Sequence, residues 1–293
     1  NLSHLLAISG MNMAFLTAFV FGLLRYGLAL LPYVALRLNT KKVAAVVSLG
    51  VAFFYLILSG ANVATERAFI MIAVMLGAVL LDRRALTLRS VAVAALLLLL
   101  FLPESLLDPG FQMSFAATIA LIVGFGAVDR SIYLQRMPRW AMPVFTLVLS
   151  SLIGGLATAP YAAAHFNRFT DYGLIANLLT VPVMGVVIMP AGALAALLAP
   201  VGLAGPPLWV MEQGARWILF VADWIAGLEG SVTPIAAPGP WVLPAFTLGA
   251  LWLVLWQGKI RLAGMLPLVA SLALWMGHGR PDLLISGDGK LLG

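Results

Sequence analysis

The chain has 293 residues, of which 62% are hydrophobic and only 10% are charged. Soluble domains carry roughly 25% charged residues, so this composition excludes a soluble globular protein and indicates an integral membrane protein. The absence of cysteine excludes disulfides and thiolate metal sites, and the three scattered histidines (His4, His165 and His278) lack metal-ligand spacing, so we expect neither a metal nor a cofactor.

Apolar segments recur along the whole chain. About 20 such residues are needed to cross the roughly 30 Å of hydrocarbon as a helix, which satisfies its backbone groups internally. The sequence therefore predicts an all-α, polytopic transmembrane bundle of about ten spans. The predicted spans are residues 10–31, 43–60, 67–81, 88–102, 110–128, 142–164, 173–199, 208–227, 241–257 and 261–277.

The positive charges are concentrated in every second loop between the predicted spans. Lys and Arg gather in cytoplasmic loops, and here eleven of the seventeen fall in alternate loops. We therefore predict that both termini and the 165–172 loop are extracytoplasmic, and that the net charge of +6 reflects topology. The eleven residues are Arg37, Lys41, Lys42, Arg83, Arg84, Arg89, Arg130, Arg136, Arg139, Lys259 and Arg261.

Polar motifs interrupt the apolar pattern at one predicted membrane face. ISGMN (Ile8–Asn12) begins the first span, and LSGAN (Leu58–Asn62) ends the second. Other polar residues reach the same depth, namely Glu66, Arg67, the run Gly110–Ser114, the run His165–Phe169 and Asn177. Taken singly, such residues are commonly helix caps or interhelical hydrogen bonds. Their convergence favours a polar vestibule, because irregular backbone at membrane depth must be buried or line water.

Three of the spans carry further signals. Pro182 and Pro190 predict a kinked or broken seventh span. The sixth span has a stripe of small residues that predicts close helix packing: Ser151, Gly154, Gly155 and Thr158. On the eighth span, Glu212, Arg216 and Asp223 share one helical face. That span either crosses the membrane with its charges toward a cavity or partner, or lies in the interface, anchored by its tryptophans.

No catalytic motif is visible. The chain lacks GxSxG, HExxH, Walker and dinucleotide-binding patterns, and Ser9 with His4 nearby is weak evidence for a nucleophile. We therefore expect no enzymatic activity in this chain.

Several separated blocks carry a family resemblance. They read HLLAISGMNM, SGANVATERAFIM, DPGFQMSFAATIAL, LATAPYAAAHFNRF and GLIANLLTVPVMGVVIMPAG. Together, over residues 1 to about 200, they resemble the competence domain of ComEC-type proteins, inner-membrane channels of natural transformation. One position departs from the family pattern, because Asn12 stands where that pattern usually has His.

The C-terminal end resembles a second domain of that family. RPDLLISGDGKLLG looks like the start of the metallo-β-lactamase-like domain that follows the channel, and the resemblance implies nuclease activity only there. We therefore expect residues 1–277 to be the channel domain and residues 278–293 to begin a truncated second domain. Because Asn1 stands at the start in place of Met, we also expect a fragment of a longer protein.

The resemblance implies a channel that conducts single-stranded DNA across the bacterial inner membrane. It also implies a periplasmic DNA receptor and a cytoplasmic motor or single-strand-binding protein as partners. The alternatives are a small-solute transporter and a non-conducting membrane anchor. Arg67 either contacts the strand or pairs with Glu66, and Phe111 or Phe166 could stack bases. The residues expected to line the path are Ser9, Asn12, Asn62, Arg67, Gln112, Ser114, Asn177 and Arg216.

Overall fold

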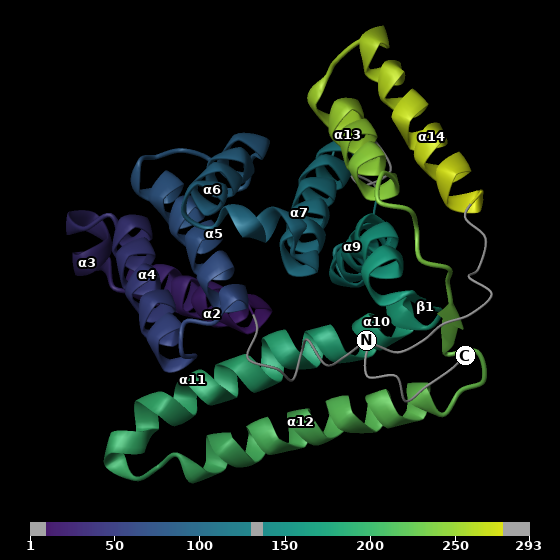
Figure 1. The fold of residues 1–293 in the computed structure, drawn as a ribbon. Coiled ribbons are helices and arrows are strands. Elements are labelled where there is room, and N and C mark those ends of the chain that lie inside the picture. The colour runs from purple at the N-terminus through teal and green to yellow at the C-terminus, as the bar shows by residue number, and fades with distance from the viewer. Residues whose placement is uncertain (1–9, 130–136, 278–293) are drawn as a thin grey trace. The chain divides into compact units, whose positions relative to one another are not determined.

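The structure, a computed structural model, describes residues 10–129 and 137–277 (Figure 1). Within these ranges the chain is helical except for one short pair of strands. Seven of the described helices are long and apolar enough to cross a membrane, and two shorter apolar helices, Leu88–Phe101 and Val242–Leu255, accompany them. The predicted all-α, multi-span membrane fold is therefore confirmed.

A helix occupies each of the ten predicted spans. In chain order they are α2 (Gly10–Ala29), α4 (Thr40–Leu58), α5 (Val63–Leu80), α6 (Leu88–Phe101), α7 (Pro109–Val128), α9 (Met142–Phe166), α10 (Gly173–Val183) joined through η2 (Met184–Ile188) to α11 (Met189–Leu198), α12 (Gly205–Ala226), α13 (Val242–Leu255) and α14 (Met265–Met276). Short elements connect them: α3 (Pro32–Arg37), η1 (Pro103–Leu107), β1 (Arg168–Thr170), η3 (Ala199–Val201), β2 (Val232–Pro234) and η4 (Lys259–Gly264).

Side-chain caps fix where several helices begin. Each capping residue accepts a hydrogen bond from the backbone N–H three positions ahead, which satisfies a donor that the helix itself leaves unpaired. In α5, α6 and α7 an apolar residue directly follows the cap, so the start of each of these helices is encoded locally. The caps are Asn39 for α4, Asn62 for α5, Thr87 for α6 and Asp108 for α7.

The chain divides into two compact units. Unit 1 comprises residues 1–157 and 171–231, and unit 2 comprises residues 158–170 and 232–293. In unit 1, α2 packs against α4 and α5 around buried Met13, Ala45 and Ala52. A second core lies among α5, α6 and α7 and includes Phe111 and Phe115, whose ring centroids are 4.4 Å apart. Phe111 is therefore a core residue and is not exposed for base stacking.

The predicted irregularity of the seventh span is also confirmed. Pro182 lies inside α10, Pro190 lies in the first turn of α11, and the five residues between the two helices form the π-helical turn η2. Helix α12 then returns along α11, η2 and α10 (Figure 1). Gly214 allows this approach, because a Cβ there would lie 2.6 Å from Ile188 Cγ1.

Unit 2 is built on a close contact between two helices. A Cβ at Gly249 of α13 would lie 2.8 Å from the Gly264 carbonyl oxygen, and a Cβ at Gly264 would lie 2.7 Å from the Gly249 carbonyl oxygen. Strands β1 and β2 pair antiparallel, with Phe169 opposite Thr233. This strand pair joins the loop that follows α9 to the loop that follows α12.

The close packing predicted for the small-residue stripe of α9 is not observed. The described residues place no atom within 4 Å of a Cβ built at Gly154 or Gly155. The nearest tight approach on this part of α9 involves Ile153, whose Cδ1 would lie 2.5 Å from a Cβ at Gly124 of α7. Close packing is therefore not confirmed at these two glycines, since small residues permit a close approach but do not specify a partner, and the prediction for Ser151 and Thr158 stays a prediction.

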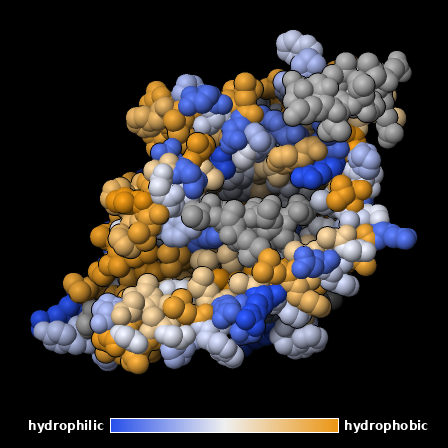
Figure 2. Space-filling model, turned by 60° about the horizontal axis from the view of Figure 1, so that its bottom comes forward, coloured by the Kyte–Doolittle hydropathy of each residue, from blue (hydrophilic) through white to orange (hydrophobic). Residues whose placement is uncertain are grey.

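Apolar side chains cover much of the surface. Figure 2 shows extensive hydrophobic areas on one face, interrupted by clusters of hydrophilic residues. Large side chains such as Leu36, Leu96 and Val186 are more than two-thirds exposed. In water so much exposed apolar surface would promote association, whereas a lipid environment would cover it. The surface therefore agrees with the composition.

We expect Gly249→Ala to destabilise unit 2. The added methyl group meets a backbone carbonyl that cannot rotate away, and overpacking of this kind costs about 1–3 kcal/mol. Gly50→Ala in α4 is the matched control, because a Cβ there meets nothing within 4 Å and alanine favours a helix over glycine. Thermal unfolding of the purified protein should show a lower midpoint for Gly249→Ala alone. Equal midpoints for the two variants would contradict the observed helix contact.

Candidate functional site

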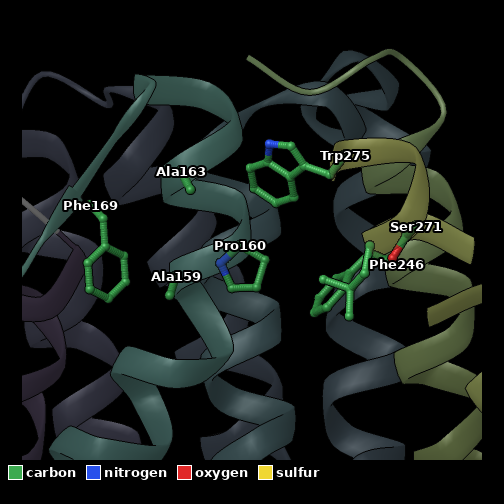
Figure 3. Close-up of a pocket in the computed structure, with 8 residues that line it drawn as sticks. Ala159, Pro160, Ala163, Phe169, Phe246, Ser271 and Trp275 are labelled. Carbon is green, nitrogen blue, oxygen red and sulfur yellow. The ribbon is translucent and has the colours of Figure 1, made fainter. Parts of the chain in front are cut away.

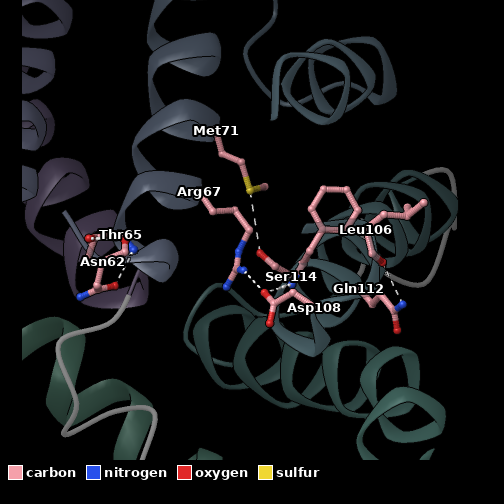
Figure 4. Close-up of polar contacts among 9 residues, drawn as sticks. Asn62, Thr65, Arg67, Met71, Leu106, Asp108, Gln112 and Ser114 are labelled. Carbon is pink, nitrogen blue, oxygen red and sulfur yellow. Dashed lines mark hydrogen bonds and ion pairs between the residues drawn. The ribbon is translucent and has the colours of Figure 1, made fainter. Parts of the chain in front are cut away.

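A close ion pair joins α5 to the start of α7. The Nη1 of Arg67, near the start of α5, lies 2.6 Å from Oδ2 of Asp108 (Figure 4). The Arg67 side chain is only 12% exposed, and that of Asp108 is 36% exposed. A charged guanidinium so far from water requires a paired counter-charge, because leaving it unpaired would cost several kcal/mol.

Asp108 and Gly110 make the geometry of this pair possible. Asp108 Oδ2 also accepts a hydrogen bond from the backbone N–H of Phe111 at 3.1 Å, so the same carboxylate caps α7. Two positions later, a Cβ at Gly110 would lie 2.6 Å from Arg67 Nη2. The sequence Asp-Pro-Gly thus supplies a cap, a first-turn proline and the space for the guanidinium.

The partner of Arg67 corrects one of the sequence-based alternatives. We had considered Glu66, its neighbour in the chain, as the counter-ion, but the structure pairs Arg67 with Asp108. Asp108 and Gly110 were not predicted as site residues. The sequence did contain a signal for this pair. An arginine at membrane depth needs an acidic partner, and the Asp-Pro that starts α7 lies at the same predicted depth.

Asn62 and its neighbours order the turn before α5. The Asn62 side chain accepts a hydrogen bond from the Thr65 backbone N–H at 3.0 Å, and the buried Thr65 hydroxyl donates to the Asn62 carbonyl at 2.9 Å (Figure 4). The Ser59 hydroxyl in turn donates to Thr65 Oγ1 at 3.0 Å. Gly60 and Ala61 both have positive φ, of 72° and 48°. The LSGAN motif therefore forms a turn and a helix cap.

Gln112 and Ser114 make contacts close to the ion pair. Gln112 Nε2 donates to the Leu106 carbonyl at 3.0 Å, which fastens α7 to η1. The Ser114 hydroxyl faces the Met71 sulfur at 3.8 Å, on the same two helices as Arg67 and Asp108 (Figure 4). We refer to Asn62, Thr65, Arg67, Asp108, Gln112 and Ser114 as the α5–α7 polar cluster.

The remaining predicted path residues have different surroundings. Asn12 is buried near the start of α2, with its side chain close to that of Tyr55 on α4. Asn177 is half-buried in α10, next to the fully buried Ala176. Ser9 lies outside the described residues. The structure thus places Asn62 and Arg67 near the start of α5, Gln112 and Ser114 near the start of α7, and Asn12 and Asn177 on other helices.

Arg216 lies on the exposed face of α12. Its Nη2 is 2.7 Å from Glu212 Oε1, in the predicted i, i+4 arrangement, and both side chains are more than half exposed. On the opposite face, Gly214 contacts η2 and the Trp217 indole N–H donates to the Leu179 carbonyl at 3.0 Å. Because Glu212 neutralises Arg216, this helix does not present an isolated positive charge.

The best-formed hollows in the described residues lie elsewhere. In unit 2 a cavity of about 190 Å³ is lined by apolar side chains from α9, β1, α13 and α14, including Phe169, Phe246 and Trp275 (Figure 3). In unit 1 a hollow of about 10 Å³ lies beside Met71, Ser90 and Thr118. Neither hollow is lined by the predicted path residues, so the polar vestibule stays a prediction. Across residues 10–129 and 137–277 we found no group of side chains able to hold a metal ion.

The many apolar helices, with an ion pair at the ends of two of them, define a multi-pass membrane protein. Residues 1–260 match the family model described as Competence protein, so the chain belongs to the competence protein family. ComE operon protein 3 of Bacillus subtilis (strain 168) is 30% identical over 255 residues. That similarity covers 86% of this chain but only 30% of the relative, so the chain spans less than a third of the relative's length. No solved structure matches the chain.

We expect Asp108→Ala to lower the free energy of unfolding by about 2–3 kcal/mol, because it removes a helix cap and leaves a mostly buried arginine unpaired. Glu66→Ala should cost less than about 1 kcal/mol, since it loses only a favourable charge in the first turn of α5. Asp108→Asn keeps the cap and should fall between the two. Denaturant or thermal unfolding of the purified variants measures these differences, and an equal cost for Glu66→Ala would argue against the observed pairing.

Proposed function

We propose that this chain is the membrane domain of a channel that conducts single-stranded DNA into the cytoplasm during natural transformation. The observation that carries the proposal is membership of the competence protein family over residues 1–260. The multi-span fold supports it, because a strand with one charge per phosphate cannot cross hydrocarbon without a protein-lined route. The proposal also assigns the protein to the bacterial inner membrane, as the family resemblance implies.

The α5–α7 polar cluster is the part of unit 1 that we assign to the strand. It combines a cation with amide and hydroxyl groups near the starts of two candidate spans. Phosphate oxygens accept hydrogen bonds from guanidinium groups strongly, so a passing strand competes with Asp108 for Arg67. In this proposal the ion pair keeps the site neutral when no strand is present, and the phosphates exchange with the carboxylate during passage.

The chain does not supply the driving energy in this proposal. Its sequence lacks nucleotide-binding motifs, so a periplasmic receptor would deliver the strand and a cytoplasmic motor or single-strand-binding protein would draw it inward. We also propose that hydrolysis of DNA is not a function of residues 1–277.

Two other functions make different predictions. A small-solute transporter would use the irregular α10–η2–α11 helix as its binding site, as broken helices do in many transporters. A membrane anchor for flanking domains would need no aqueous route at all. Water-soluble thiol reagents separate these functions, since only a conduit is labelled at several successive depths along single-cysteine variants in α5 and α7.

We expect Arg67→Ala to abolish most DNA uptake while the amount of protein in the membrane is unchanged, and Arg67→Lys to retain part of it. Asp108→Asn should be milder than Arg67→Ala, because it keeps the α7 cap and leaves the cation for the strand. Glu66→Ala should resemble the unmodified protein. The measurement is transformation frequency beside membrane abundance, in transformable cells whose own copy of the full-length gene is deleted.

The comparison of Arg67→Ala with Asp108→Asn is the decisive control. If the pair serves only to hold α5 against α7, both variants should lose transformation together, in proportion to lower abundance. That result would remove the support for strand contact while leaving the family assignment untouched.

We also expect both termini and the 165–172 loop to be extracytoplasmic. The chain contains no cysteine, so single-cysteine variants give clean labelling. In intact cells stripped of the outer membrane, a membrane-impermeant maleimide should label Asp171→Cys but not Arg84→Cys or Lys259→Cys. Labelling of Arg84→Cys from the outside would reverse the proposed orientation.

A further inference from the structure

One end of unit 1 carries a dense group of positive charges. The ion pair between Lys42 Nζ and Asp82 Oδ2, at 2.7 Å, places the start of α4 beside the turn between α5 and α6. That contact brings two loops of the chain together at a single end of the helices. We call the resulting group the basic patch; it consists of Arg37, Lys41, Lys42, Arg83, Arg84 and Arg89.

Few acids balance this patch. Asp82 is the only acid between Leu23 and Gly60 or between Leu76 and Pro103, and Lys42 already engages it. The hydrogen bond from Lys42 holds the pKa of Asp82 below its usual value, so this carboxylate stays ionised around neutral pH. Even if Asp129, the C-cap of α7, is counted at this end, two acids face six cations. The patch therefore keeps a clear positive excess.

Exposed apolar side chains lie next to these cations. The short helix α3 directly follows the candidate span α2, and Leu30 and Leu36 are 82% and 88% exposed. Tyr33 is also exposed, and the Arg37 guanidinium lies over its ring at 4.3 Å. Cations beside exposed leucines at the end of a spanning helix are typical of segments that lie in the membrane interface.

We propose that the basic patch and α3 together bind anionic phospholipids. The phosphate groups would contact Arg83, Arg84 and Arg89, and α3 would lie among the headgroups with Leu36 toward the acyl chains. Charge complementarity favours an anionic lipid over a zwitterionic one. The exposed leucines favour a lipid over a nucleic acid, which would offer them no apolar partner. This inference does not depend on whether the chain conducts DNA.

The test measures lipid retention. The protein is purified from mixed phosphatidylglycerol and phosphatidylcholine nanodiscs, and bound lipids are counted by native mass spectrometry. The combined variant Arg83→Gln, Arg84→Gln, Arg89→Gln should lose at least about tenfold in preference for phosphatidylglycerol. The control Arg168→Gln, Lys259→Gln, Arg261→Gln removes three charges elsewhere and should keep that preference. Equal loss in both variants, or no loss in the first, would overturn the proposal.

A second measurement does not depend on the charge variants. A nitroxide attached at Leu36→Cys should be more accessible to oxygen than to a water-soluble nickel chelate, as expected at headgroup depth. A label at Glu104→Cys, in η1 at the opposite end of α6, should show the water-exposed pattern instead. Water-like accessibility at Leu36→Cys would overturn the proposal. So would a combined arginine variant that keeps its lipids but no longer binds a single-stranded oligonucleotide, which would identify a nucleic-acid surface.

Discussion

Hydrocarbon offers no hydrogen-bond partner to the backbone, and most of this structure follows from that constraint. Side chains cap the helices where they begin, as Asn62 and Asp108 do for α5 and α7. Where Pro182 interrupts the regular pattern, the chain forms the π-helical turn η2, and the Trp217 indole supplies a donor to the Leu179 carbonyl. Helix α12 packs along the whole of this irregular segment and so covers it.

The same absence of water gives the Arg67–Asp108 pair its importance. In a dry environment a cation and an anion attract strongly, but neither tolerates the loss of the other. Asp108 serves two purposes with one carboxylate, since it also caps α7. A substitution at Asp108 therefore changes both the charge balance and the start of a helix. Only Asp108→Asn separates the two effects, because it removes the charge and keeps the cap.

Much of the fold could be predicted from the sequence, because hydrophobic length and charge alternation act locally. A helix at each of the ten predicted positions, the irregular seventh helix and the shared end of the Lys42 and Arg84 loops were accessible in this way, although α12 is not among the helices apolar enough to count as candidate spans. The partner of Arg67 was not, since Asp108 lies 41 positions away and only tertiary packing brings the two together. The sequence was equally silent on the partner of the α9 stripe: small residues mark a surface that another helix could approach closely, and no such approach is found at Gly154 or Gly155.

Unit 2 is assembled from two parts of the chain that are far apart in sequence, residues 158–170 and 232–293. β2 begins 62 positions after β1 ends. At a synthesis rate of about 5–20 residues per second, the residues between the two strands take roughly 3–12 s to synthesise, and β1 has no partner strand during this time. During that interval α10, α11 and α12 are synthesised, while the second half of α9 has only β1 from its own unit beside it. The order of assembly is thus built into the connectivity, and truncation before Val232 would leave β1 without its partner strand.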